Sequence, residues 1–424
     1  MIPLPLDELR GLGRLEGDAA EVTGVEIDSR RAGPGDLFVA VGGGAAFLDD
    51  ARAHGAAATL VPDDEHAAMA ALGRAVRGRS GAKVVAITGS SGKTSTKDIL
   101  AALCRPVART VAADGGHNNE IGLPLTLTRI EPDTEVVITE MGMRGLGQIA
   151  ELCAIARPDV GVISSIGPVH LELVGTVENV ARAKAEVVVS LPPGGTAVVP
   201  SGVPELEPFL AREDIEVVRF GPDGDAELES FEPGETAVVA FADGTCVELP
   251  VRFTARMQAS NLVAALAAYR ALGLPLDRAA EGSVSIAFSP WRLEESPLAG
   301  GGLLVNDAYN ANPASMRAAL EHLVERAQRR RTVAVLGDMA ELGDAAPRFH
   351  EEVGLFARGL GVDVIVGVGE LARGYEPDEW TPDAASAVPV VRGVVEPGDA
   401  VLVKGSRAIG LETVADALAG VPAC

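Results

Sequence analysis

The feature that most constrains this chain is a glycine-rich turn between an apolar strand and a helix. The apolar run Lys83–Thr88 is typical of a buried strand, the residues GSSGKT (89–94) follow it directly, and a helical pattern then extends to Leu103. Such a turn aims several backbone N–H groups and the positive end of a helix at one point, and this arrangement binds phosphate. We therefore predict a phosphate-binding loop for ATP.

The residue types in this loop have distinct expected tasks. Gly89 and Gly92 let the backbone approach phosphate oxygens, Lys93 supplies a charge for the β- and γ-phosphates, and Thr94 can ligate Mg²⁺. The spacing is GxxGKT, with Ile87 where a longer motif has its first glycine. The alternative is that this loop is a turn that binds no ligand. The position of the loop between an apolar strand and a helix argues against this alternative. The expected ATP contacts in the loop are Gly89, Ser90, Ser91, Gly92, Lys93, Thr94 and Ser95.

Strand-like and helix-like segments divide the chain of 424 residues into three expected domains. Residues 1–82 contain short apolar runs and the helical segment Glu65–Val76, followed by a predicted linker at 77–81; they predict a small N-terminal α/β domain. Residues 83–296 alternate strand and helix around the loop and predict a P-loop domain with a parallel sheet. Residues 297–424 restart the alternation and predict a C-terminal Rossmann-like domain. The predicted fold class is thus α/β in three domains.

The composition excludes several partners. The net charge of −24 argues against a broad surface for nucleic acid or membrane, because both are anionic. No apolar run approaches the ~20 residues that span a bilayer, and the first residues resemble no signal peptide, so we expect a cytoplasmic protein. The scattered cysteines suggest neither a zinc site nor a disulfide framework. These cysteines are Cys104, Cys153, Cys246 and Cys424.

The second segment also contains three titratable residues whose positions allow more than one interpretation. Glu140 ends an apolar strand, where folds of this class place a magnesium ligand. His170 follows the strand Val160–Ser164, and Lys184 lies in a helical segment. Taken alone, each also fits a plainer role: a surface carboxylate, a histidine that hydrogen-bonds within the fold, and a solvated lysine.

Polar residues also follow the strands of the third segment. The run Asn306–Pro313 can hydrogen-bond ribose and adenine, and it also fits an Asx turn in which Asn312 caps a helix opened by Pro313. Both interpretations can hold together. Asp338, in the segment GDMAELG, and the segment KGSR (404–407) come after other strands, at the edge where open sheets bind ligands.

Together these segments resemble the Mur ligases, in order and over nearly the whole chain. NNEIG, YNANP and GDMAELG are similar to the branch of this family that adds D-alanyl-D-alanine to a UDP-N-acetylmuramoyl-tripeptide. The matching segments are IDSR (27–30), GDLFVAV (35–41), GSSGKTSTK (89–97), HNNEIGLPLTL (117–127), TEMG (139–142), GPVHLELVG (167–175), ARAKAEV (181–187), DAYNANPASM (307–316), LGDMAELG (336–343) and VKGSR (403–407).

The resemblance implies a reaction and a set of site residues. A carboxylate attacks the γ-phosphate of ATP to give an acyl phosphate, and an amine then displaces phosphate, so catalysis is mainly positioning and charge neutralisation. By the family pattern, Lys93, Glu140, His170 and Lys184 are catalytic. Thr94 and Glu140 hold one Mg²⁺, and His170 contributes to a second together with a carbamylated Lys184. The remaining implied contacts are Asn261, Arg292, Asp307 and Asn310 to ATP, and Ser29, Arg30, Asn118, Asn119, Asp338, Lys404 and Arg407 to the substrates.

Three functional hypotheses follow. The first is that the chain joins D-Ala-D-Ala to UDP-N-acetylmuramoyl-tripeptide for peptidoglycan. The second is a ligase of this fold that serves a specialised-metabolite pathway, because the segment 42–47 is shorter and less polar than the family loop beside the nucleotide sugar. The third is a nucleotide-binding partner without turnover, against which Lys93, Thr94 and Glu140 argue. We expect a monomer that acts on small molecules.

Overall fold

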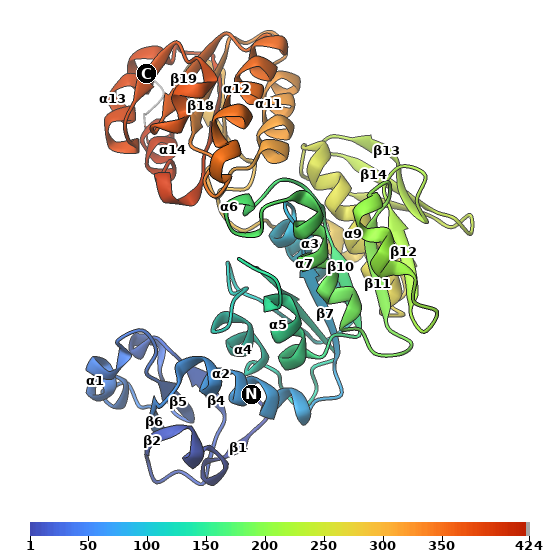
Figure 1. Cartoon of the computed structure of the whole chain (residues 1–424), viewed down its shortest axis with the longest axis vertical. Coiled ribbons are helices and arrows are strands. Elements are labelled where there is room, and N and C mark those ends of the chain that lie inside the picture. Colours follow the sequence, from blue (N-terminus) through green and yellow to red (C-terminus); the bar gives the residue numbers. More distant parts are fainter. Residues whose placement is uncertain (421–424) are drawn as a thin grey trace. The chain divides into compact units, whose positions relative to one another are not determined.

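The computed structural model describes residues 1–420 and has the predicted α/β fold in three domains (Figure 1). By its contacts the chain forms two compact units. The first contains Met1–Ser164, Arg182–Arg252 and Ser260–Ala287, and the second contains the remaining residues. The domain boundaries at residues 82 and 296 stay predictions.

The N-terminal sheet has four strands in the order β2-β6-β5-β4, with β2 antiparallel to β6 and the other pairs parallel. Helix α2 begins where the Asp64 side chain accepts a hydrogen bond from the Ala67 N–H. The strands are β1 (Leu4–Pro5), β2 (Gly13–Glu16), β3 (Glu21–Val22), β4 (Gly24–Glu26), β5 (Asp36–Val39) and β6 (Ala58–Pro62), and the helices are α1 (Leu48–Ala53) and α2 (Glu65–Gly78).

The linker predicted at residues 77–81 is wrong at its start. Helix α2 continues through Arg77, whose guanidinium is buried and donates to the carbonyl oxygens of Ala156 at 2.8 Å and Ala82 at 3.1 Å. Because an arginine can satisfy several carbonyls at once, this one ties the end of α2 to the central domain. Only Arg79–Gly81 remain outside a helix.

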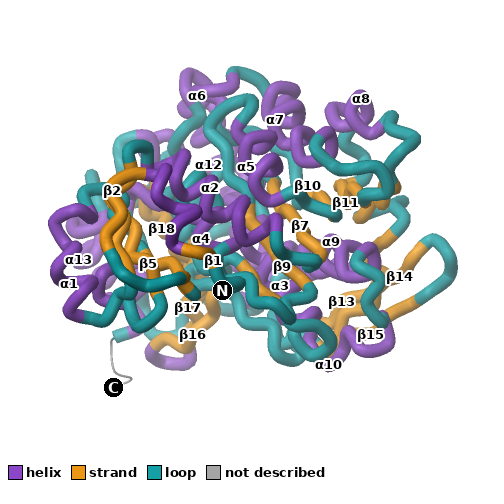
Figure 2. The backbone as a smooth tube through the Cα atoms, turned by 90° about the horizontal axis from the view of Figure 1, so that it is seen from below, coloured by secondary structure: helices purple, strands orange, loops and turns teal. Residues whose placement is uncertain are grey.

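The central sheet has nine strands in the order β15-β14-β13-β12-β11-β10-β7-β9-β8. It is parallel from β13 to β8, and β13, β14 and β15 form an antiparallel extension. Figure 2 shows these last three strands next to one another. The strands are β7 (Lys83–Thr88), β8 (Thr110–Ala112), β9 (Val136–Glu140), β10 (Val160–Ile163), β11 (Thr196–Pro200), β12 (Glu216–Phe220), β13 (Ala226–Glu232), β14 (Thr236–Phe241) and β15 (Cys246–Pro250). The helices are α3 (Lys93–Cys104), α4 (Gly122–Leu127), α5 (Gln148–Ala156), α6 (Leu171–Val174), α7 (Val177–Val189), α8 (Glu207–Leu210), α9 (Arg256–Ala271) and α10 (Ala279–Ser283).

The C-terminal sheet has six strands in the order β16-β17-β21-β18-β19-β20, parallel except for the pair β16 and β17. Helices α11 and α12 lie on one face and α13 and α14 on the other (Figure 1). The strands are β16 (Glu294–Leu298), β17 (Gly302–Asp307), β18 (Thr332–Gly337), β19 (Val364–Val368), β20 (Glu379–Thr381) and β21 (Ala400–Lys404), and the helices are α11 (Pro313–Ala327), α12 (Ala346–Gly359), α13 (Ala384–Val394) and α14 (Glu412–Ala419).

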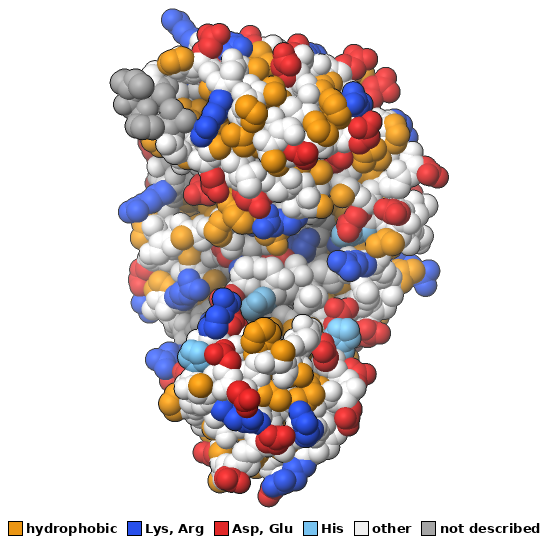
Figure 3. Space-filling view, turned by 90° about the vertical axis from the view of Figure 1, so that its left-hand side faces the viewer, with side chains coloured by type: hydrophobic (Ala, Val, Ile, Leu, Met, Phe, Trp, Pro, Cys, Tyr) orange, Lys and Arg blue, Asp and Glu red, His pale blue; other side chains and the backbone are white. Residues whose placement is uncertain are grey.

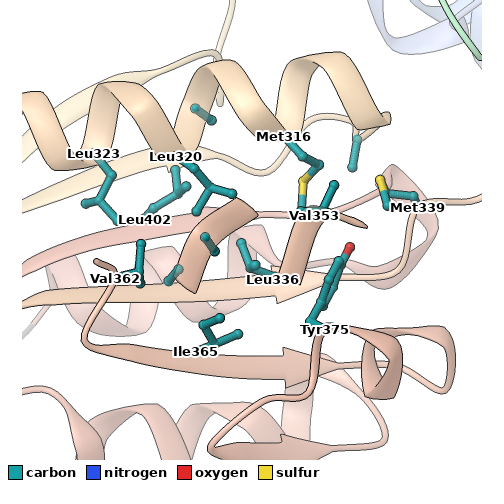
Figure 4. Close-up of a cluster of buried hydrophobic side chains, with 14 of the residues drawn as sticks. Met316, Leu320, Leu323, Leu336, Met339, Val353, Val362, Ile365, Tyr375 and Leu402 are labelled. Carbon is teal, nitrogen blue, oxygen red and sulfur yellow. The ribbon is translucent and has the colours of Figure 1, made fainter. Parts of the chain in front are cut away.

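Two apolar cores hold this sheet between its helices. Figure 4 shows the one that α11 and α12 cover, where Met316 and Leu320 of α11 face Leu336 of β18. Gly410, with φ 74°, separates a short 3₁₀ turn from α14. The predicted cap of α11 is confirmed, since Asn312 and Ser315 form a capping box and Pro313 is the first helical residue.

The surface carries charges of both signs (Figure 3), and the described cysteines are free thiols. On the face shown in Figure 3, Lys and Arg are interspersed with Asp and Glu. No helix within residues 1–420 combines the length and the apolar character needed to cross a membrane. Cys104 and Cys153 are buried, which raises the pKa of each thiol to about 12, and Cys246 is exposed. Cys424 lies outside the described residues.

Candidate active site

The phosphate loop joins β7 to α3 as predicted. Gly89 has φ 147° and Gly92 has φ 82°, values that favour glycine. A Cβ atom at Gly92 would lie 2.3 Å from Asn261 Oδ1, so only glycine fits against this side chain of α9. The Lys93 ammonium donates to the Gly89 carbonyl oxygen at 2.8 Å and closes the loop.

Asn261 brings a second element to the loop. Its side chain is buried, and Nδ2 has no hydrogen-bond partner among residues 1–420. A buried amide donor without a partner is costly and calls for an explanation. At the phosphate loop, an acceptor on a bound nucleotide would satisfy it, so the residues present fit ATP. The nucleotide contact of Asn261 stays a prediction.

Thr94 of α3 and Glu140 of β9, both predicted as magnesium ligands, contact each other through a hydrogen bond. Glu140 is the last residue of β9 and only 2% exposed, and its Oε2 accepts from Thr94 Oγ1 at 2.7 Å. Its Oε1 accepts from Asn118 Nδ2 at 2.9 Å. A hydroxyl and a carboxylate are oxygen ligands suited to Mg²⁺. Within residues 1–420, no group of three or more His, Cys, Asp or Glu could hold a metal ion, so a cation here would need ligands of other kinds.

Lys184 of α7 is among the largest fully buried side chains of the described chain, with 1% exposure. Burial, and then the neighbouring positive charge of Lys93, hold the pKa of the Lys184 ammonium well below its ordinary value of 10.5. No ion pair of Lys184 occurs among residues 1–420. The plain interpretation of a solvated lysine is therefore wrong, and the side chain is a buried amine beside the phosphate loop.

His170 belongs to the second compact unit, whereas Thr94, Glu140 and Lys184 belong to the first. It precedes α6 with φ 53°, and its Nδ1 lies 2.5 Å from Oε2 of Glu341. The Glu172 N–H donates to the Glu341 carbonyl oxygen at 3.3 Å. The segment around His170 is thus attached to the segment GDMAELG of the C-terminal domain.

A buried ion pair marks the ends of β17 and β21. Lys404 Nζ lies 2.5 Å from Asp307 Oδ2 and 2.9 Å from the Asn310 carbonyl oxygen, which accepts a hydrogen bond. Asp307 Oδ1 accepts from the Leu293 N–H at 3.1 Å. The Asn310 side chain accepts from the Ala311 N–H at 2.9 Å. Residues from two separately predicted segments, Asp307 and Asn310 from one and Lys404 from the other, therefore lie together at these strand ends.

Two arginines lie against aromatic rings close to this pair. The Arg292 guanidinium is 3.9 Å from the centre of the Tyr309 ring, and that of Arg407 is 4.6 Å from the Trp291 ring. Trp291 has φ 61° and Leu293 has φ 53°, unusual conformations for side chains of this size. Such backbone strain clusters at functional sites. Neither aromatic residue was predicted from the sequence as a site residue.

The segment after β18 is held by its own contacts. Asp338 Oδ1 accepts from the Ala372 N–H at 2.8 Å, and the Asp338 carbonyl oxygen accepts from the Ser406 N–H at 3.0 Å. The Met339 N–H donates to Nε2 of buried His350 at 2.9 Å. Burial lowers the pKa of His350, which favours the neutral ring that this bond requires.

The substrate contacts predicted in the first domain, Ser29 and Arg30, lie in the 3₁₀ turn between β4 and β5 of the N-terminal sheet. Ser29 is buried at the start of a 3₁₀ turn, and exposed Arg30 pairs with Asp28 at 2.6 Å, which lowers the pKa of that carboxyl to about 2. The Gly42 N–H lies 3.1 Å from both carboxylate oxygens of Glu65. The glycine segment is therefore anchored to α2.

Three hydrogen bonds of the first unit were not predicted from the sequence. The amide of Asn118, predicted to contact substrate, donates to Glu140, while Asn119 Oδ1 accepts from the Gly122 N–H at 2.8 Å. Ser164 Oγ donates to the Ser91 carbonyl oxygen at 2.5 Å. The position of Ser164 just after β10, the neighbour of β7, is the sequence signal that could have found it.

The chain is similar to known proteins over nearly its full length. Residues 87–269 match the family model of the Mur ligase middle domain, and residues 291–407 match that of the Mur ligase, glutamate ligase domain. The UDP-N-acetylmuramoyl-tripeptide--D-alanyl-D-alanine ligase of Mycobacterium tuberculosis is 34% identical over 96% of this chain and 94% of the relative. The ligase of the same name from Escherichia coli is 32% identical over 99% of each.

Solved structures agree. The structure of MurF from Acinetobacter baumannii superposes with a TM-score of 0.87 at 29% identity and covers 99% of both chains. That of MurF ligase from Thermotoga maritima in complex with ADP gives a TM-score of 0.80 at 29% identity and covers 93% of this chain and 97% of that one.

Proposed function

The chain belongs to the Mur ligase family of ATP-dependent amide ligases, and we propose that it joins D-alanyl-D-alanine to UDP-N-acetylmuramoyl-tripeptide in peptidoglycan synthesis. The observation that carries the proposal is the similarity at 30% identity and above to ligases of that name over nearly the whole chain. It extends through the first domain, where the acyl substrate is expected to bind.

The groups around the phosphate loop support activation of a carboxylate by ATP. The N–H groups of the loop and the Lys93 ammonium would hold the β- and γ-phosphates, with the free Nδ2 of Asn261 as a further donor. Positioning and charge neutralisation carry most of the rate in phosphoryl transfer. Arg292, Asp307 and Asn310 would each contact ATP.

The same site fits Mg²⁺, which when bound would neutralise charge on the phosphates. Thr94 and Glu140 would hold one ion, because both offer buried oxygens. His170 would contribute to a second ion, with its Nδ1 beside Glu341. The first ion would thus have oxygen ligands from Thr94 and Glu140, and the second would have a nitrogen ligand from His170.

Lys184 would become a further metal ligand if its amine were carbamylated. Because burial and Lys93 lower its pKa, more of its amine is neutral near neutral pH than in an exposed lysine. The neutral nitrogen can attack CO₂, forming an N–C bond and releasing one proton, which gives a carbamate anion. The product would offer oxygen ligands to a cation and remove the unfavourable positive charge from the buried site.

The substrates would occupy the other predicted residues. Ser29 and Arg30 would contact the uridine nucleotide, and Asn119, Asp338, Lys404 and Arg407 would contact the peptide portions. A specialised-metabolite ligase remains the second candidate on the basis of the short segment 42–47 alone. The full-length relatives from Mycobacterium tuberculosis and Escherichia coli do not favour it.

An assay of the purified enzyme tests the proposal. ADP release should require both UDP-N-acetylmuramoyl-tripeptide and D-Ala-D-Ala, and mass spectrometry should detect the pentapeptide product. ATP turnover with other acceptors but none with this pair would reject the proposal. The variant Lys93→Ala should abolish product formation while the far-ultraviolet circular dichroism is retained; product formed at an unchanged rate would show that the loop does not activate ATP.

A further inference from the structure

We propose that Asn118 is a positioning residue that fixes the Glu140 carboxylate for cation binding. The inference rests on the proposed function, in which Glu140 and Thr94 hold Mg²⁺. It assigns to Asn118 a task different from the substrate contact expected from its motif.

The hydrogen bonds of Glu140 fix its carboxylate and leave lone pairs for a cation. The carboxylate is almost completely buried, and each oxygen accepts one bond, Oε2 from the Thr94 hydroxyl at 2.7 Å and Oε1 from Asn118 Nδ2 at 2.9 Å. An ionised carboxylate has about four lone-pair sites. Two donors therefore fix the plane of the group and leave a lone pair on each oxygen for a cation.

Asn118 is itself held in place through both its backbone and its side chain. Its backbone carbonyl oxygen accepts from the Gly142 N–H at 2.8 Å, which ties it to the residues just after β9. A Cβ atom at Gly142 would lie 3.1 Å from Asn118 Oδ1, so the side-chain amide lies tightly against this glycine. The orientation of the amide is chemically determined, since a carboxylate accepts and only the NH₂ end of the amide donates.

The neighbouring asparagine has a separate task. Asn119 Oδ1 accepts from the N–H groups of Ile121 at 3.2 Å and Gly122 at 2.8 Å, and so stabilises the turn that leads into α4. Asn119 makes no hydrogen bond to Glu140 within the described chain. Replacing Asn118 therefore changes the contact with the Glu140 carboxylate, whereas replacing Asn119 changes only the turn that leads into α4.

The expected consequence lies in metal affinity. Groups that orient metal ligands through hydrogen bonds typically contribute about 10–100-fold to affinity or activity. Asn118→Ala should therefore weaken binding of Mn²⁺, used in place of Mg²⁺, by about 10–100-fold. It should raise the Mg²⁺ concentration needed for half-maximal rate and leave the KM for the UDP-sugar peptide unchanged.

The experiment measures Mn²⁺ affinity by electron paramagnetic resonance in the full-length protein with saturating ADP, in the absence of acyl substrate. Wild type, Asn118→Ala and Asn119→Ala are compared. Weakened binding in Asn118→Ala, with wild-type affinity in Asn119→Ala, supports the proposal. Wild-type affinity in Asn118→Ala, or equal losses in both variants, overturns it. Because no acyl substrate is present, the result does not depend on which carboxylate the enzyme activates.

A second variant decides the matter if Asn118→Ala fails to fold. Gly142→Ala places a methyl group against the Asn118 amide and removes no polar atom, and the backbone of Gly142 is not in the left-handed region. A several-fold loss of Mn²⁺ affinity in this variant supports the proposal. An unchanged affinity overturns it.

Discussion

Two lysines, one in the central domain and one in the C-terminal domain, are buried to the same degree but in opposite electrostatic environments. Lys184 is 1% exposed and Lys404 is 2% exposed. Lys404 lies against Asp307 and the Asn310 carbonyl oxygen, so its charge is met by acceptors. Lys184 has no ion pair among the described residues, and the neighbouring charge of Lys93 is of the same sign.

This difference shows that burial alone does not distinguish a lysine that stabilises the fold from one that serves the active site. A buried cation that is paired is part of the fold, because removing one partner leaves the other charge unmet. A buried cation without an acid is a destabilising feature that a fold retains for chemistry. On this comparison, Lys404 joins the ends of β17 and β21 through Asp307 and Asn310, whereas Lys184, unpaired among the described residues, is the amine that the proposed function assigns to reaction with CO₂.

The largest expected effect on stability is at Lys404. Lys404→Met should lower the free energy of unfolding by about 3–5 kcal/mol, because the buried Asp307 carboxylate then lacks a cation. Urea denaturation measures the change. The double variant Asp307→Asn/Lys404→Met should recover most of the loss, and a single-variant loss below about 1 kcal/mol would mean that the pair is not buried in solution.

Lys184→Met should give the opposite pattern. The ligase rate should fall by about 10²–10³-fold, as when one electrostatic group of an active site is removed. The free energy of unfolding should stay equal or rise, because an apolar side chain of similar volume replaces an unpaired amine. Steady-state rates and urea denaturation on the same preparation measure both. A loss of stability comparable to that of Lys404→Met would remove the contrast between the two lysines.

The phosphate loop and Glu140 were predictable from the sequence because their signals are local. A strand, a glycine turn and a helix occupy consecutive residues, and the end of an apolar strand fixes the position of Glu140 at the sheet edge. The three-domain α/β fold followed from the alternation of apolar patterns. The cap formed by Asn312 and Pro313 is equally local and was predicted correctly.

The environments of Lys184 and Asn118 were not predictable, because they depend on packing between distant segments. The segment ARAKAEV fits a solvated helix as well as a buried one, and α7 packs closely on the sheet, where a Cβ atom at Gly161 would lie 3.2 Å from Val187. Asn118 and Glu140 are separated by 22 positions. Only the fold shows that the amide faces the carboxylate.

The lowered pKa of Lys184 also predicts how stability depends on pH. Between its lowered pKa in the folded state and about 10.5 in the unfolded state, the unfolded chain binds more protons. Stability should therefore rise with pH across this window, by at most about 1.4 kcal/mol per pH unit for one proton. Urea denaturation under CO₂-free conditions measures the slope.

Lys184→Met is the matched control for this slope. The variant should lack the pH dependence that Lys184 gives to the free energy of unfolding. The difference in the free energy of unfolding between wild type and variant should therefore narrow as the pH rises toward 10.5. Identical pH profiles for the two proteins would show that Lys184 titrates as an exposed lysine does, and the comparison with Lys404 would then lose its basis.

The smallest expected effect is at Arg30, whose side chain is exposed and pairs only with exposed Asp28 among the described residues. Arg30→Ala should leave the unfolding transition in place, since exposed ion pairs contribute little to stability. It should raise the KM for the UDP-sugar peptide several-fold and leave kcat and the KM for ATP unchanged, because it removes a contact made equally in the ground and transition states. The matched control is Arg10→Ala, which removes another exposed pair of the same domain, with Asp7, outside the proposed site. Equal KM values for the two variants would exclude Arg30 from substrate binding and would leave the recognition of the nucleotide to the buried Ser29 side of the turn.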